Sequence, residues 1–322
     1  MSLRRAVLKF GAILTLAFPN LANAQGTAVP TWLQHHVGYE DGKIAPIVLS
    51  RARALHQDKV RRGKVRNSCY LAMDATRPST APDGTPSRRF YTICENTRIF
   101  RASSSGYGNG RKLARANFSN GRTCAKNFSN AEGSKLTMGG AYVTAESRTS
   151  FKGMYREGSQ IKPFYRTFLL FDGEKETRNA RERAIGGHQA MFLKWQCRMK
   201  MPQSRHADEN GYVPFGRLVD YTSGRSNGCT TWSSEETAEI LQRVNGNPTT
   251  LYIYPESRDI NAVAQVARAG GSPAQQGLYW NATCLKEIGA PRFWPKRELQ
   301  PVINRWRQSL PKQAPRELPI CK

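Results

Sequence analysis

Short runs of β-branched and aromatic residues recur through the middle of the chain, separated by clusters of glycine, proline, serine and asparagine. Short apolar runs bounded by turn residues predict β-strands. Because few helical patterns interrupt these runs, we expect a mainly β core, built as a sandwich or an open barrel, with helices flanking it. The runs are residues 69–73, 89–94, 98–102, 167–171 and 251–254.

Helical patterns lie on either side of this core. Residues 46–62 mix apolar positions with arginine and lysine at helical spacing, which predicts a basic helix within an N-terminal helical brace, residues 25–66. Residues 258–268 and 295–310 predict two more helices in a helical C-terminal extension that runs from residue 257 to residue 322. Its aromatic residues favour ordinary packing over a sugar-binding surface, although both interpretations stay open.

One helix is expected inside the core. Ser233 and Glu236 have the spacing of a capping box, and an apolar face follows them until Gly246, which is expected to end the helix. The helix begins shortly after Cys229, so it would give the loop that carries this cysteine a rigid support.

The first 24 residues have the pattern of a secretory signal peptide. Basic residues precede an apolar run at positions 10–18, and the small-residue motif Ala-Asn-Ala ends at position 24. The apolar run is shorter than the roughly 20 residues that span a bilayer, so we expect no integral membrane span after cleavage. The sequence therefore predicts an exported protein, located in the periplasm.

The chain is strongly basic, with 49 lysines and arginines against 24 acidic residues and a formal charge of +25. Such a charge attracts polyanions such as nucleic acid, anionic lipid or an anionic cell wall. Since export argues against nucleic acid, peptidoglycan with its free stem carboxylates is the expected partner. Charge alone predicts attraction, not catalysis.

Seven cysteines leave at least one thiol unpaired in an oxidising compartment. We expect that thiol to be Cys229, with up to three disulfides among the other six and Cys284 paired with Cys321. There is no C-x-x-C pair, so a zinc or thioredoxin-type site is not indicated, and no metal or organic cofactor is expected.

Residues 223–229, Ser-Gly-Arg-Ser-Asn-Gly-Cys, have the composition of a tight turn that ends in a thiol. The backbone N–H groups of Asn227, Gly228 and Cys229 would then form an oxyanion hole beside the nucleophile. The alternative is a surface loop whose cysteine is buried or disulfide-bonded.

A cysteine nucleophile needs a base, and His188 is the first candidate. Residues 183–185 look like the end of a strand, so that Gly186 and Gly187 would open a turn that displays the histidine. A hydrogen-bonded loop histidine is the alternative, and His206 is a rival base.

Several motifs in order resemble the YkuD-like murein L,D-transpeptidases. The run N-A-R-E-R-A-I-G-G-H, residues 179–188, and the run G-R-S-N-G-C, residues 224–229, resemble the catalytic segments of the branch with a G-R-S-x-G-C motif. Upstream, F-S-N-x-x-G-S at residues 128–134 and G-x-Y-x-T at residues 140–144 resemble that branch's other signatures. The likeness covers roughly residues 68–255.

The resemblance implies a β-rich transpeptidase domain, residues 67–256, that cross-links peptidoglycan stem peptides and reacts with carbapenems. Cys229 would form a thioester with a donor stem, and His188 would act as general base and acid. The backbone carbonyl of Gln189 would orient the imidazole, although the family often has Gly or Ser there. Substrate binding would fall to Arg225, Ser226, Gly140, Tyr142 and Thr144.

Residues 191–221 are an apparent insertion, interpreted as a lid over the donor stem. The residues do not distinguish 3→3 from 1→3 cross-links. Two other functions also stay open, namely an L,D-carboxypeptidase or endopeptidase on the same scaffold, and a non-catalytic basic wall-binding protein.

Overall fold

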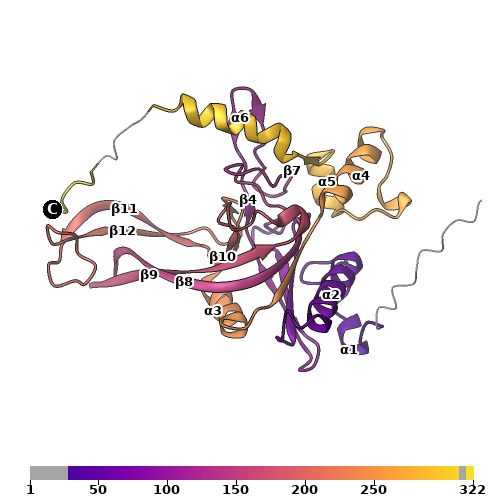
Figure 1. The fold of residues 1–322 in the computed structure, drawn as a ribbon, viewed down its shortest axis with the longest axis horizontal. Helices are drawn as coiled ribbons and strands as arrows, with labels where there is room; N and C mark the ends of the chain where they lie inside the picture. The colour runs from indigo at the N-terminus through magenta and orange to yellow at the C-terminus, as the bar shows by residue number, and fades with distance from the viewer. Residues whose placement is uncertain (1–27, 312–316) are drawn as a thin grey trace, which may run out of the picture.

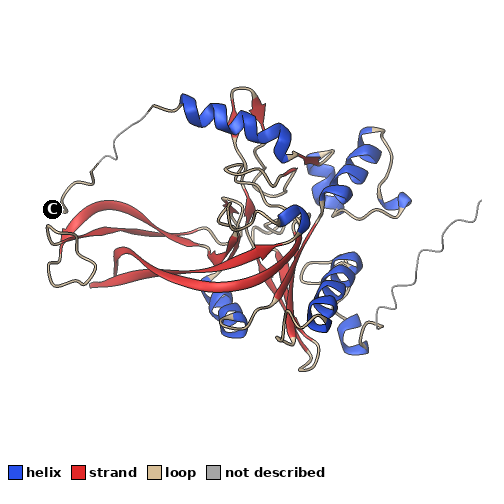
Figure 2. Ribbon diagram, viewed as in Figure 1, coloured by secondary structure: helices blue, strands red, loops and turns tan. Residues whose placement is uncertain are grey.

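The computed structural model describes residues 28–311 and 317–322, so the signal peptide predicted at residues 1–24 lies outside the described part. The described chain is mixed α/β and mostly sheet, with six α-helices and one large mixed sheet (Figure 1, Figure 2). The strands of the core join this one sheet. The predicted β-rich core is therefore present as a single hydrogen-bonded sheet with helices beside it.

The sheet has ten strands, and its main path runs β14-β10-β9-β8-β15-β1-β2-β3. The pairs β10/β14 and β1/β15 are parallel, and the other pairs along the path are antiparallel. Beyond β3, the N–H of Gly106 donates to the carbonyl of Thr231 in β14, so the two ends of the path approach each other. The bounds are β1 Cys69–Asp74, β2 Arg88–Cys94, β3 Ile99–Ser104, β8 Gly140–Glu157, β9 Gln160–Gly173, β10 Gly186–Gln189, β14 Thr230–Trp232 and β15 Thr250–Tyr254.

Three short two-stranded sheets lie outside it. They pair β13 Arg225–Ser226 with β4 Tyr107–Gly108, β16 Arg292–Phe293 with β7 Asn127–Phe128, and β5 Lys112–Leu113 with β6 Ala116–Asn117. The first matters for the site, because it attaches the loop before Cys229 to the segment that follows β3.

The centre of the sheet is covered on both faces, which explains why β1 and β15 are apolar at nearly every position. Tyr70 and Tyr252 face helix α2, Pro46–Arg61, whereas Leu71 and Leu251 face the main core. Each of these side chains is at most 4% exposed. Burial on both faces yields continuous apolar runs rather than alternation. The helix predicted at residues 46–62 is therefore present and packs on the sheet, preceded by the short helix α1, Thr31–Gln34.

The long strands β8 and β9 extend past the body of the molecule as an arm (Figure 1). The predicted insertion at residues 191–221 forms a second hairpin, β11 Met191–Lys200 and β12 Tyr212–Asp220, which lies along the first. The contact between them is a parallel pairing of Phe215 with Met154 and of Gly216 with Tyr155. The insertion thus extends the sheet and does not form a separate loop.

The C-terminal part packs onto the body through α4 Ser257–Arg268, α5 Ala282–Ile288 and α6 Lys296–Ser309. Helices α4 and α6 are the two predicted at residues 258–268 and 295–310, and α5 was not predicted. Within the core, helix α3, Ser234–Val244, begins at the predicted capping box. Pro301 lies inside α6 without ending it.

Three disulfides join Cys69 to Cys94, Cys124 to Cys284, and Cys197 to Cys321, and Cys229 is free. The unpaired thiol is the predicted one, but the predicted Cys284–Cys321 pair is wrong. Cys284 is fully buried in the core beside Cys124, whereas the chain end lies against β11 at the arm (Figure 1).

The turn predicted at Gly186 and Gly187 is also wrong, because both glycines belong to strand β10. They are needed there for close packing. A Cβ on Gly187 would lie 2.0 Å from the indole ring of Trp232, and one on Gly186 would lie 2.2 Å from the carbonyl oxygen of Leu169. The turn comes earlier, at Ala184, whose φ is +50°.

We expect Gly187→Ala to lower the free energy of unfolding by about 1–3 kcal/mol or more, because buried Trp232 has no space to move. Urea denaturation measures this. Gly121→Ala is the matched control, since its new Cβ would come no closer than 3.4 Å to any neighbour. Equal stability of the two variants would contradict the close packing at β10.

Candidate active site

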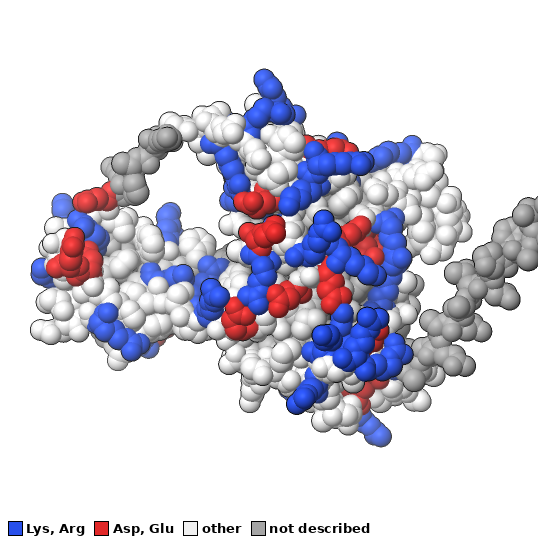
Figure 3. Space-filling view, in the orientation of Figure 1, with Lys and Arg blue, Asp and Glu red and all other residues white. Residues whose placement is uncertain are grey.

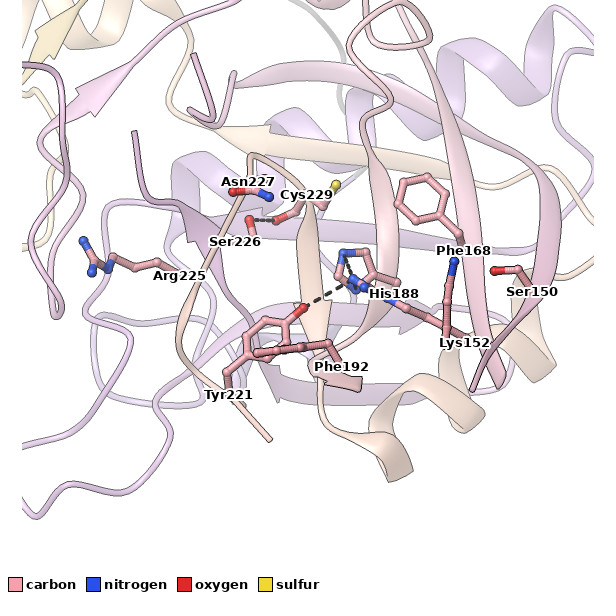
Figure 4. A pocket seen from close by; sticks show the side chains of 11 residues that line it. Ser150, Lys152, Phe168, His188, Phe192, Tyr221, Arg225, Ser226, Asn227 and Cys229 are labelled. Atoms are coloured by element: carbon pink, nitrogen blue, oxygen red, sulfur yellow. Dashed lines mark hydrogen bonds between the residues drawn. The ribbon is translucent and has the colours of Figure 1, made fainter. Parts of the chain in front are cut away.

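A pocket of about 740 Å³ lies where the arm meets the body (Figure 4). Strands β8, β9, β10 and β11 and the segment from residue 221 to residue 229 contribute its walls. Both predicted catalytic residues line it, together with three basic side chains and no acidic one. The lining residues are Ser150, Lys152, Arg166, Phe168, His188, Phe192, Tyr221, Arg225, Ser226, Asn227 and Cys229.

Cys229 sits between β13 and β14 and is 7% exposed. Its thiol donates to the carbonyl oxygen of Ala184 over 3.6 Å. Ser226 holds the turn together, because its hydroxyl accepts from the N–H of Gly228 at 3.1 Å and donates to the carbonyl of Cys229 at 2.6 Å (Figure 4). Gly228 has φ +113°, a backbone conformation that favours glycine. Ser226 therefore shapes the loop that carries the thiol.

His188 is placed by the pairing of its own strand. In β10 it lies opposite Thr231 of β14, which follows Cys229 by two residues, and opposite Phe168 of β9. The ring of Phe168 stacks on the imidazole with centroids 5.5 Å apart. Strand register thus brings the histidine and the cysteine to one pocket.

The backbone carbonyl of Gln189 lies 2.8 Å from Nδ1 of His188. A carbonyl oxygen only accepts hydrogen bonds, so Nδ1 carries the proton and Nε2 has the lone pair of a base. The orienting role predicted for this carbonyl is compatible with the geometry even though the residue is glutamine.

Arg166, in β9, is a site residue that the sequence analysis missed. Its Nη2 lies 2.7 Å from Nδ1 and 2.8 Å from Nε2 of His188, and 3.4 Å from the hydroxyl of Tyr221. The only sequence signal is alternation: Arg166 and Phe168 are two apart in a strand and so share a face. That face is recognisable as the site only once β9 is known to pair with β10.

Burial and charge keep the imidazole of His188 and the thiol of Cys229 neutral. The pKa of His188 falls to about 4, mainly because the ring is buried and then because of the Arg166 charge, while the Gln189 carbonyl opposes the shift. Burial raises the pKa of the Cys229 thiol, against smaller lowering effects of the Gly186 N–H and of the Arg166 and Arg183 charges. At neutral pH the site therefore holds a thiol beside an unprotonated imidazole.

The hydrogen bonds of the turn reduce the number of N–H groups available to the predicted oxyanion hole. The N–H of Gly228 already donates to Ser226, which leaves the N–H groups of Asn227 and Cys229 as the remaining predicted donors. The backbone of Gly186 acts on the thiol instead, where it lowers the pKa of Cys229 against the larger effect of burial.

Three predicted substrate-binding residues do not line the pocket. Gly140, Tyr142 and Thr144 are buried at the start of β8, where the Tyr142 hydroxyl donates to the carbonyl of Met138 and the Thr144 hydroxyl accepts from the N–H of Thr249. The described contacts give them a structural role.

Of the other predicted residues, Arg225 lines the pocket and His206 does not. Arg225 lines the pocket, with its guanidinium donating to the carbonyl of Asn120 at 2.7 Å. His206 lies on the arm, stacked on Phe151 and 3.1 Å from the Tyr165 hydroxyl, and does not line the pocket. Its position does not suit a base for Cys229.

Within residues 28–311 and 317–322, no group of three or more His, Cys, Asp or Glu side chains is placed to hold a metal ion. No helix in that part of the chain is both long and apolar enough to cross a membrane. Comparisons with protein-family models, curated proteins and solved structures found no match.

We expect iodoacetamide to alkylate native protein at Cys229 alone, and slowly at pH 7, because the thiol's pKa is raised and the other cysteines are paired. The rate should keep rising with pH where a free cysteine, with a pKa near about 8.5, has levelled off. Mass spectrometry of peptides measures this, with Cys229→Ala as the control. A rate that is already constant below pH 7 would contradict a neutral resting thiol.

Proposed function

We propose that this protein is an exported, cysteine-dependent L,D-transpeptidase with a YkuD-like catalytic domain, acting on peptidoglycan stem peptides. One observation carries the proposal: the free thiol of Cys229 and the imidazole of His188 line the same basic pocket. The carbonyl of Gln189 fixes the tautomer of that imidazole. The motifs that resemble the family supply both residues. Three disulfides are compatible with an oxidising compartment, and the periplasm is the location proposed.

The reaction would proceed in two acyl transfers. The sulfur of Cys229 attacks the carbonyl carbon of the donor stem while Nε2 of His188 takes the thiol proton. Backbone N–H groups stabilise the oxyanion, and the intermediate collapses to a thioester as His188 returns the proton to the departing amine. An acceptor amine then attacks the thioester and gives its proton to His188, which passes it to the departing sulfur and so restores the Cys229 thiol. The acceptor would be the side-chain amine of a diaminopimelate residue, and water in its place would give hydrolysis.

The charge of the site suits this substrate. Stem peptides carry free carboxylates, and the pocket offers Lys152, Arg166 and Arg225 without an acidic neighbour in its lining. On the wider surface, lysine and arginine side chains spread over both the body and the arm (Figure 3). Electrostatic attraction would concentrate the protein at an anionic wall.

The test is to incubate the protein with disaccharide tetrapeptide monomers and to analyse the products by mass spectrometry. We expect new dimers, and we expect Cys229→Ala and His188→Ala to form none. His206→Ala is the matched control and should form dimers as the unmodified protein does, because His206 lies outside the pocket.

Fragmentation of the dimers would place the donor carbonyl at stem position one or three. Shortened monomers without dimers would make the protein a hydrolase on the same site. Unchanged monomers with every variant would reject both activities and favour a non-catalytic, wall-binding function. A carbapenem adduct on Cys229, absent in Cys229→Ala, would support the proposed family.

A further inference from the structure

Arg166 has an unusual set of neighbours. In the described residues it makes no ion pair, its Nε is buried without a hydrogen-bond partner, and its Nη2 contacts an imidazole. A guanidinium has five N–H donors and is normally satisfied by carboxylates or carbonyls. Arg166 therefore retains unused donors inside the pocket.

The contact with His188 is made with the ring as a whole. Nδ1 carries a hydrogen that faces the Gln189 carbonyl, so it has no lone pair to offer Arg166. Nη2 of Arg166 lies almost equally far from both ring nitrogens, 2.7 Å from Nδ1 and 2.8 Å from Nε2. The guanidinium charge is thus held directly against the imidazole.

The strand register keeps Arg166 beside the base. Phe168 lies opposite His188 in the β9/β10 pair, and Arg166 precedes Phe168 by two residues on the same face. In the β8/β9 pair, Ser150 of β8 lies opposite Arg166, and Lys152 of β8 lines the same wall of the pocket. The arm thus presents two cations and a hydroxyl next to His188, which is the chemistry of a carboxylate site.

We propose that Arg166 is a carboxylate receptor that rests against the imidazole of His188 in the unliganded protein and turns to a peptide carboxylate that enters the pocket. The carboxylate accepts a bidentate pair of hydrogen bonds from the guanidinium, whose charge then no longer acts on the imidazole alone. The identity of the ligand as a stem peptide rests on the proposed function. The existence of a carboxylate site does not.

The charges around His188 give this arrangement a consequence for protonation. Arg166 faces the ring from β9, Lys152 lies on the same wall in β8, and Tyr221 and Cys229 come from the segment after β12. A bound carboxylate neutralises the nearest cation. This favours the imidazolium, so the pKa of His188 should rise from about 4 towards its ordinary value of about 6.5.

The test uses full-length Cys229→Ala protein, which binds without turnover, and follows the ring nitrogens of His188 by ¹⁵N NMR as a function of pH. The two probes are N-acetyl-D-alanine, which carries one carboxylate, and its uncharged amide. We expect the carboxylate to raise the His188 pKa by about one pH unit or more, and the amide to leave it unchanged.

In the Cys229→Ala protein, the further substitution Arg166→Gln should raise the pKa of His188 in the absence of ligand. N-acetyl-D-alanine should then no longer change that pKa. Arg156→Gln is the matched control, because it removes one exposed arginine from the arm outside the pocket and should behave as the parent does. Equal effects of the carboxylate and the amide would overturn the proposal, and this comparison needs no change at Arg166. An unchanged His188 pKa in Arg166→Gln would overturn it as well.

The outcome is separable from the proposed function. A carboxylate response without muropeptide cross-linking would leave the receptor standing and reject the transpeptidase. Cross-linking without a carboxylate effect on the His188 pKa would support the transpeptidase and reject the receptor.

Discussion

The site depends on one short parallel pairing, between β10 and β14. This pairing sets His188 opposite Thr231, and Cys229 lies two residues before Thr231, so a single register brings an imidazole and a thiol that are 41 positions apart in the chain to one pocket. The pairing is possible because Gly187 leaves space for the indole ring of Trp232. Helix α3, which starts at the Ser233 cap directly after β14, then fixes the other end of that strand. The geometry of the pocket is therefore a consequence of sheet packing.

The sequence predicted the features that depend on neighbouring residues or on composition alone. The capping box at Ser233 placed helix α3, odd cysteine number singled out a free thiol, and a glycine-rich turn indicated that it is Cys229. The glycines at 186 and 187 gave the wrong local structure, because glycine fits a turn and a close packing contact equally well. Composition does not distinguish these two uses.

What the sequence could not predict depends on long-range pairing. Arg166 becomes a site residue only through the β9/β10 register, and the partner of Cys284 follows from where α5 packs. The arrangement of residues 191–220 as a second hairpin beside β8 likewise depends on a contact between distant strands, at Phe215 and Met154. Such pairings leave no local pattern, because each strand shows only its own alternation of buried and exposed positions.

The resting state of the site follows from the same burial that positions it. A thiol whose pKa is raised is mostly protonated at neutral pH, and protonated thiols are poor nucleophiles and exchange slowly with disulfides. In a chain with three disulfides, this protects the free Cys229 from disulfide exchange. In the proposed reaction, Cys229 would have to be activated by proton transfer to His188 within the occupied pocket, since neither group is charged beforehand. Binding of an anionic substrate in this basic pocket would meet that requirement, because it would change the charge next to the imidazole when the proton has to move.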